Sequence, residues 1–208
     1  MNLQRATGIT LVAISALASL AACSSAAKSP PSSIGSSTGS PGANPGAHAT
    51  ESAPAGDIPD TQAFVPYTST TPGYTVNVPE GWARTTTGKV IAFTDKYNSI
   101  QIAAATMATQ PTVSSARSSE LPVIAAASSA FRLGDVQSVT RSAGSAVLIT
   151  YQADSAPNPV TGKVVVEAVQ RYEFWRSGSE VTITLASPVG SDNVDPWRKV
   201  TDSFAWTR

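Results

Sequence analysis

Residues 72–82 read Pro-Gly-Tyr-Thr-Val-Asn-Val-Pro-Glu-Gly-Trp and carry the clearest structural pattern in the chain. Apolar residues at positions 74, 76 and 78 alternate with polar ones, which is the period of a β-strand that buries one face. The Pro-Glu-Gly that follows predicts a turn, and this turn leads into Trp82, an expected core residue. The segment therefore predicts a protein built on a sheet.

Downstream, similar alternation and short apolar runs predict six further strands. They span residues 90–94, 99–107, 136–141, 145–153, 163–175 and 180–186. The connections Ser142-Ala143-Gly144 and Ser177-Gly178 are short and contain glycine, which favours antiparallel pairing. We therefore expect a central antiparallel sheet of about six to seven strands.

Two segments have the apolar spacing of helices. The stripe of the first consists of Leu121, Ile124, Ser128 and Phe131. Because proline fits only the first turn, Pro122 predicts that this helix begins at residue 119 or 120, and Gly134 predicts its end.

The second expected helix has Asp195 as its cap and Pro196 in its first position. Its buried stripe consists of Trp197, Val200 and Phe204. The fold class is then α+β, an α/β sandwich in which both helices cover one face of the sheet. Whether the other face is covered stays open.

The domain organisation follows from where the aromatic residues lie. All 14 of them fall between Phe64 and Trp206, and these side chains supply much of the apolar area that a core buries. We assign residues 63–208 to one folded domain, a usual domain size. Among residues 24–57, 26 of 34 are Ser, Ala, Gly or Pro, a composition that cannot offset its own ordering entropy. Residues 23–62 are therefore interpreted as a disordered linker headed by Cys23.

The first 22 residues have the layout of a bacterial signal peptide. Arg5 precedes an uncharged, largely apolar run that ends in Leu20-Ala21-Ala22-Cys23, the pattern of a lipobox. We expect cleavage between Ala22 and Cys23, with acyl chains carried on Cys23. Two or three such chains anchor a protein firmly. The expected location is the outer face of a bacterial cell membrane.

Residues 72–82, together with the last helix from Pro196-Trp197 to Ser203-Phe204, resemble the PsbP/Mog1-like domains over residues 64–208. With the lipobox and the linker, the chain resembles the actinobacterial LpqN-type lipoproteins. The resemblance implies a central antiparallel sheet flanked by helices, in a family that mostly binds or scaffolds. Members are connected with cell-envelope lipids and with membrane-protein partners. Because Pro-x-Gly-Trp is a structural turn, the resemblance transfers no binding residue.

Several kinds of chemistry lack their residues. The 14 basic and 14 acidic residues give zero formal net charge, which argues against a nucleic-acid partner. Cys23 and His48 are the only cysteine and histidine, and both precede the domain, so the domain has neither a nucleophile–histidine pair nor a zinc ligand set. Asp192 and Asp195 are too few for calcium, and a cap role explains Asp195. We expect no cofactor and no metal.

Two features of the longest strand remain as site candidates. Glu167 and Glu173 share one face with Arg171 between them, and paired carboxylates can hydrolyse glycosides, although interleaved charges are more typical of a solvated face. Tyr172, Phe174 and Trp175 make the strand apolar on both faces. Such a strand either lies in the core or lines a groove for an acyl chain or a partner peptide.

Three functions are consistent with these residues. The first is a membrane-anchored, non-catalytic binding or scaffold module of the cell envelope, whose partner is an envelope lipid or a membrane protein. The second is a carrier of an amphiphilic lipid, which needs an apolar cavity of roughly 300 Å³ or more. The third is an envelope hydrolase that uses carboxylates. Because the net charge is zero, we expect binding to depend little on salt.

Overall fold

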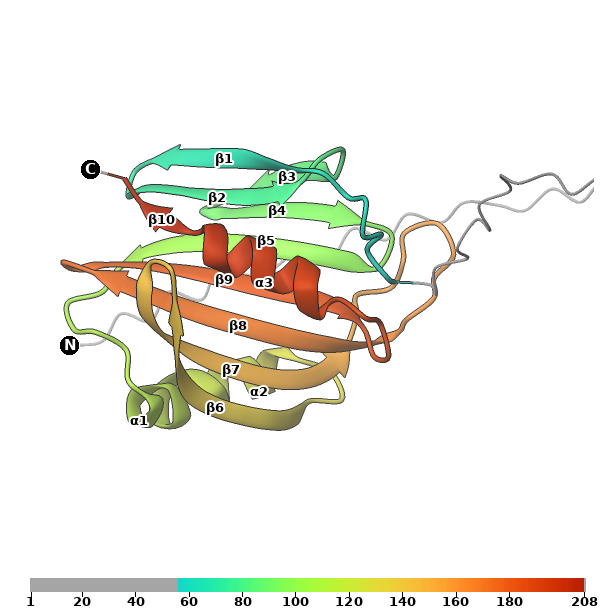
Figure 1. Cartoon of the computed structure of the whole chain (residues 1–208). Helices are drawn as coiled ribbons and strands as arrows, with labels where there is room; N and C mark the ends of the chain where they lie inside the picture. The colour runs from blue at the N-terminus through green and yellow to red at the C-terminus, as the bar shows by residue number, and fades with distance from the viewer. Residues whose placement is uncertain (1–55, 208) are drawn as a thin grey trace, which may run out of the picture. The chain divides into compact units, whose positions relative to one another are not determined.

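Strands dominate the part of the chain that the computed structural model describes, residues 56–207 (Figure 1). The described strands are β1 (Phe64–Thr70), β2 (Gly73–Pro79), β3 (Ala83–Thr87), β4 (Val90–Asp95), β5 (Asn98–Thr106), β6 (Arg132–Arg141), β7 (Gly144–Asp154), β8 (Val166–Arg176), β9 (Ser179–Pro188) and β10 (Ala205–Trp206). The described helices are α1 (Val113–Ser115), α2 (Leu121–Ala127), with a π-helical turn at Ala116–Glu120 between them, and α3 (Val194–Ser203). The signal peptide, Cys23 and nearly all of the linker lie outside the described residues.

The strands form two antiparallel sheets. One has seven strands in the order β3-β4-β5-β9-β8-β7-β6, and the other has three in the order β1-β2-β10. The α+β class and the central antiparallel sheet are thereby confirmed. Within residues 56–207, no helix combines the length and the apolar character needed to cross a membrane.

The main core lies between the seven-stranded sheet, α3 and the small sheet. Trp197, Val200 and Phe204 are buried there, as their spacing predicted. The alternating side chains of β2 enter the same core, because Tyr74, Val76 and Val78 are each 3% exposed or less. Asn193, rather than Asp195, is the residue that precedes α3, and Asp195 lies in its first turn.

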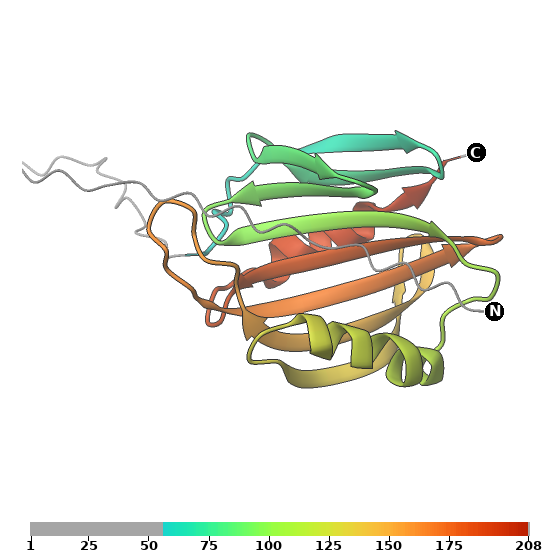
Figure 2. The ribbon, with the colours of Figure 1, turned by 180° about the vertical axis from the view of Figure 1, so that it is seen from behind.

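The two helical segments cover opposite faces of the large sheet, which corrects the expectation that both cover one face. In Figure 1, α3 lies in front of the sheet, whereas Figure 2 shows α1 and α2 in front of β6 and β7 on the reverse face. A second, smaller core forms under α1 and α2. Its buried members are Ala116, Val136, Val147 and Ile149.

The first helical segment begins earlier and ends earlier than predicted. It starts at Val113 behind a Thr112–Ser115 capping box, and Pro122 lies in the first turn of α2, directly after the π-helical turn. Proline is tolerated there because the first turn of a helix does not use its backbone N–H groups, and α2 ends at Ala127. Gly134 is therefore no helix end.

Gly134 instead lies at a β-bulge in β6, between Leu133 and Asp135. A Cβ atom at this position would come within 2.6 Å of Thr150 Oγ1, so the bulge requires glycine. Strand β6 thus starts four residues before the predicted strand, and Phe131 is outside the helix.

The folded contacts reach back to Gly56, ahead of the expected domain start at residue 63. Ile58 is 5% exposed, and its backbone N–H donates to Asn193 Oδ1 at 2.8 Å. Asn193 Nδ2 in turn donates to the carbonyl oxygen of Gly56 at 2.9 Å. A single isoleucine anchors this segment, and the distribution of aromatic residues did not reveal it.

Candidate functional site

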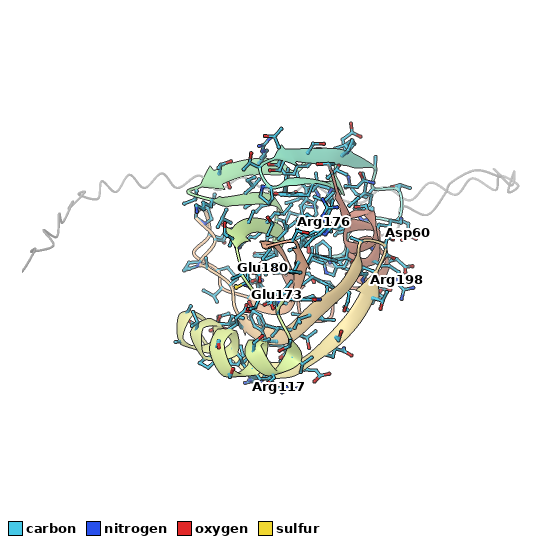
Figure 3. All side chains as sticks on the ribbon, turned by 90° about the vertical axis from the view of Figure 1, so that its left-hand side faces the viewer. Asp60, Arg117, Glu173, Arg176, Glu180 and Arg198 are labelled. Carbon is cyan, nitrogen blue, oxygen red and sulfur yellow. The ribbon has the colours of Figure 1, made fainter. Side chains whose placement is uncertain are left out.

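Four ionisable side chains meet on the sheet face that α1 and α2 cover: Glu120, Arg171, Glu173 and Glu180, here called the carboxylate cluster. Arg171 donates from Nη2 to Glu120 Oε2 and from Nε to Glu173 Oε1, both at 3.2 Å. Glu180 joins from β9, opposite Trp175 and diagonal to Glu173 in the strand register. Figure 3 shows Glu173 and Glu180 close together above the helical segment.

Glu173 is the most deeply buried acid of the cluster. Its side chain is 0% exposed, and no donor reaches its Oε2 atom. Burial, followed by a hydrogen bond to Glu120 and the charge of Glu120, raises the pKa of this carboxyl to about 8, although Arg171 opposes the shift. Glu173 therefore holds its proton at neutral pH.

Glu180 has a similar environment. Its Oε1 atom accepts a hydrogen bond from Thr182 Oγ1 at 3.3 Å, while its buried Oε2 atom has no partner. Burial raises the pKa of Glu180, and the charge of Glu120 adds to this effect. The cluster thus sets three carboxyl groups against one guanidinium group.

A surface depression of about 310 Å³ adjoins the cluster, and we call it the Trp175 pit. Its lining residues are Gln110, Pro111, Thr112, Val113, Ser138, Ser145, Ala146, Val147, Glu173 and Trp175. Glu173 is the one ionisable residue among them. The indole N–H of Trp175 donates to the Met107 carbonyl oxygen at 2.8 Å, which fixes the ring in place.

The groove predicted at Tyr172, Phe174 and Trp175 is corrected by the strand geometry. Tyr172 and Phe174 are 3% and 1% exposed and belong to the main core on the α3 side. Because side chains alternate along a strand, Trp175 points to the other face and reaches the pit. Val166 begins β8, and the preceding Val164 is 44% exposed, so no continuous apolar groove forms along the predicted strand.

The predicted pair of Glu167 and Glu173 does share one face of β8, but the structure does not bring the two carboxyl groups together. Six residues of strand separate them, a span of about 20 Å. Glu167 lines a different depression, beside Tyr151 and Asp154. Glu173 instead pairs with Arg171 and interacts with Glu120, and Glu180 lies diagonally across the strand pair; the sequence pattern predicted neither Glu120 nor Glu180 here. The Ser177-Gly178 turn was the available signal for Glu180, because it places Glu180 opposite Trp175.

The described residues show no sign of a lipid cavity or a metal centre. The depressions on the surface are open to solvent, and the core under α3 is filled by side chains such as Phe174 and Phe204, which are 1% and 0% exposed. Within residues 56–207, no three His, Cys, Asp or Glu side chains are grouped so that they could hold a metal ion.

Comparison with known proteins supports the fold. No protein-family model and no curated protein matches the chain. The solution structure of cyanobacterial PsbP (CyanoP) from Synechocystis sp. PCC 6803 is similar, with a TM-score of 0.53 and 13% identity over 73% of this chain and 98% of that one. The chain has a PsbP-like fold.

Two further structures are similar to this PsbP-like chain at lower scores. The Saccharomyces cerevisiae Ran-binding protein Mog1p gives a TM-score of 0.47 with 10% identity over 70% of this chain and 96% of that one. LpqN of Mycobacterium tuberculosis, described as involved in cell envelope biogenesis, gives 0.39 with 15% identity over 72% and 93%. None of these likenesses assigns a role to a residue of the Trp175 pit.

Proposed function

We propose that this chain is an LpqN-type actinobacterial lipoprotein, anchored through Cys23 to the outer face of the cell membrane. On this proposal the PsbP-like domain is a non-catalytic module that binds an envelope component in the Trp175 pit. The sequence Leu20-Ala21-Ala22-Cys23 supports the anchor. Signal peptide, linker and domain are then residues 1–22, 23–62 and 63–208, with folded contacts that begin at Gly56.

The anchor has a direct test. Cys23→Ala removes the thiol that carries the acyl chains, so we expect the variant to move from the membrane fraction to the soluble fraction without loss of fold. Detergent partitioning measures this, with Ser24→Ala as the matched control. Full retention of the Cys23→Ala chain in the membrane contradicts lipidation at Cys23.

One observation carries the proposed binding role. Glu173 is fully buried beside the pit, and no donor among the described residues reaches its Oε2 atom. Buried polar atoms are rarely left unpaired, because each one loses its hydrogen bonds to water and gains nothing in return. A ligand in the pit is the natural source of the missing partner, and the fixed Trp175 ring supplies apolar contact area.

The test compares two tryptophan variants of the full chain, each reconstituted in lipid vesicles. Envelope lipid extract or detergent-solubilised membrane protein is added to these vesicles, and the tryptophan fluorescence of the chain is followed. We expect saturable binding that persists in about 0.5 M salt, because contacts inside a pit are little screened. Trp175→Phe weakens it at least about tenfold, whereas Trp206→Phe, on β10, does not. Equal binding by both variants contradicts the proposal.

The raised pKa of Glu173 also supports a second candidate, an envelope hydrolase. A carboxylic acid that is protonated at neutral pH can act as a general acid. In that case the chain turns over glycosidic substrates, and Glu173→Gln abolishes turnover while binding remains. If the chain is a binding module, neither the wild type nor Glu173→Gln turns over a glycosidic substrate.

A further inference from the structure

We infer that the Trp175 pit takes the primary ammonium group of an aliphatic side chain, as a lysine or another diamino acid of an envelope peptide presents it. This inference rests on the proposed function and names the ligand class of that site. It is carried by the charge, the unpaired atoms and the lining of the pit.

The charges around Glu173 are unbalanced when its carboxyl group is ionised. The groups that face Glu173 are Glu120 from the π-helical turn, Arg171 from its own strand and Glu180 from β9. Arg171 is the one cation among these four groups. Arg117 is close in sequence to Glu120 but pairs with Asp135, and Figure 3 shows it on the outer side of the helical segment. Once Glu173 is ionised, the cluster therefore carries more negative than positive charge, which an ammonium group offsets.

The second step is the unpaired oxygen atoms. Among the described residues, three buried side-chain polar atoms lack a partner, and two of them are Glu173 Oε2 and Glu180 Oε2. Both are acceptors when ionised, and of the two residues Glu173 also lines the pit. An ammonium group has three donors and no acceptor, so it matches a site where carboxylate oxygens lack donors.

The third step is the pit itself. Pro111, Val113 and Val147 offer apolar contact to an alkyl stem, and the Trp175 ring offers a π face to a cation. The Trp175 N–H is already bonded to Met107, so the ring contributes its face rather than a donor. About 310 Å³ accommodates the end of a side chain, at the lower end of ligand pockets.

The lining also favours a peptide amine over an ethanolamine lipid. In phosphoethanolamine, the phosphate lies two carbons from the ammonium group and needs a cation of its own. No Lys or Arg lines the Trp175 pit, and its one ionisable residue is an acid. A plain alkylamine brings no such anion.

Binding of an ammonium group has a pH signature. Because Glu173 holds a proton at neutral pH, the ligand binds best after that proton has left, and binding therefore releases a proton. A carboxyl with a pKa of about 8 goes from roughly one-tenth ionised at pH 7 to nine-tenths at pH 9. An alkylamine stays charged over this range. Affinity then rises about tenfold from pH 7 to pH 9.

The experiment uses the full chain in detergent micelles, with tryptophan indole nitrogens labelled for NMR. The probe is Nα-acetyl-lysine amide, and Nα-acetyl-norleucine amide is its uncharged counterpart. We expect a saturable shift of the Trp175 indole resonance with the lysine compound alone, about tenfold tighter at pH 9 than at pH 7. Glu173→Gln removes the pH dependence and weakens binding at pH 9 at least about tenfold. Glu167→Gln, the matched control on the same strand, behaves as wild type.

Several results overturn the inference. Equal binding of the norleucine compound, affinity that is flat or falls with pH, or wild-type binding by Glu173→Gln each contradict an ammonium site. If O-phosphoethanolamine binds more tightly than the lysine compound, the ligand is a lipid headgroup, and the inference of a peptide amine is wrong. If no amine shifts the Trp175 resonance while envelope material still binds through Trp175, this inference fails and the proposed function stands. If neither an amine nor envelope material binds through Trp175, both this inference and the proposed function fail.

Discussion

At the scale of single residues, Glu173 shows how burial changes the meaning of a charge pattern. In the sequence, Glu167, Arg171 and Glu173 look like one solvated face of a strand. In the structure, the helical segment that carries Glu120 covers one end of that face and leaves the other end open. The period of the strand placed the three side chains correctly, but only the tertiary packing decides which carboxyl loses water.

The raised pKa of Glu173 makes stability depend on pH. In the unfolded chain this carboxyl ionises near its ordinary pKa of 4.5, whereas the folded chain keeps the proton up to about pH 8. The folded state thus binds more protons in this window, so the free energy of unfolding falls as pH rises from 4.5 to 8. We expect the urea midpoint of the wild type to fall between pH 5 and pH 8, and that of Glu173→Gln to fall less steeply.

Glu80→Gln, at an exposed position, is the control for this series and should follow the wild type. Parallel pH profiles for wild type and Glu173→Gln would show that Glu173 ionises normally in the folded chain.

Phe204 is a fully buried aromatic residue of the main core. It is 0% exposed, and its ring stacks on Phe174 with centroids 4.4 Å apart and lies 5.8 Å from Tyr74. Phe204→Ala should lower the free energy of unfolding by about 3–5 kcal/mol, a large part of the usual total. Trp82, expected from the sequence to be equally critical, is half-buried and packs edge-on against Trp197.

Urea denaturation of Phe204→Ala beside Trp82→Ala measures the difference. The smaller loss is expected for Trp82→Ala. A Phe204→Ala chain as stable as the wild type would contradict the placement of this ring at the centre of the core.

At the scale of elements, the periodicity of the sequence predicted which strands and helices exist better than it predicted where they begin and end. The strands β2, β4, β5, β7, β8 and β9 were expected within a few residues, because one buried face imposes a period of two. Pro122 does lie in the first turn of α2, as predicted, but the helical segment starts earlier because α1 and the π-helical turn precede α2. Gly134 was taken as a helix end because a bulge glycine and a terminal glycine have the same sequence appearance.

Gly134→Ala tests the bulge. The added Cβ would lie 2.6 Å from Thr150 Oγ1 and 3.0 Å from the Thr150 carbonyl oxygen, so the strand must shift. Overpacking of this kind costs about 1–3 kcal/mol. We expect thermal unfolding of Gly134→Ala at a lower temperature than that of Gln137→Ala, an exposed position on the same strand. Equal melting of the two variants would show that the bulge does not need glycine.

At the scale of the whole molecule, the fold could be predicted and the site could not. A strand ending in Pro-x-Gly-Trp and a last helix with a Trp-Val-Phe stripe identify a PsbP-like fold, since both are local patterns. The carboxylate cluster joins residues 120, 171, 173 and 180 from three elements. Such a site depends on which face the first helical segment covers, and no local pattern in the sequence encodes that choice.

The domain boundary gives a prediction for the whole fold. A fragment of residues 56–208 should unfold cooperatively, whereas a fragment of residues 63–208 should be less stable by about 2–5 kcal/mol, because it lacks the buried Ile58 side chain. It also loses the hydrogen bond from Ile58 to Asn193. Calorimetry of the two fragments measures this, and equal stability would show that residues 56–62 add nothing to the core.

If the domain binds an envelope component in the Trp175 pit, as we propose, the residues that line the pit change most on binding. The measurement that tests this is NMR: the backbone amide chemical shifts of the full chain are mapped while the envelope component that it binds is added. We expect the largest shifts on residues 110–113, Ser138, residues 145–147, Glu173 and Trp175, which line the pit from four separate parts of the chain. Shifts concentrated instead on α3 or on the small sheet would contradict the claim.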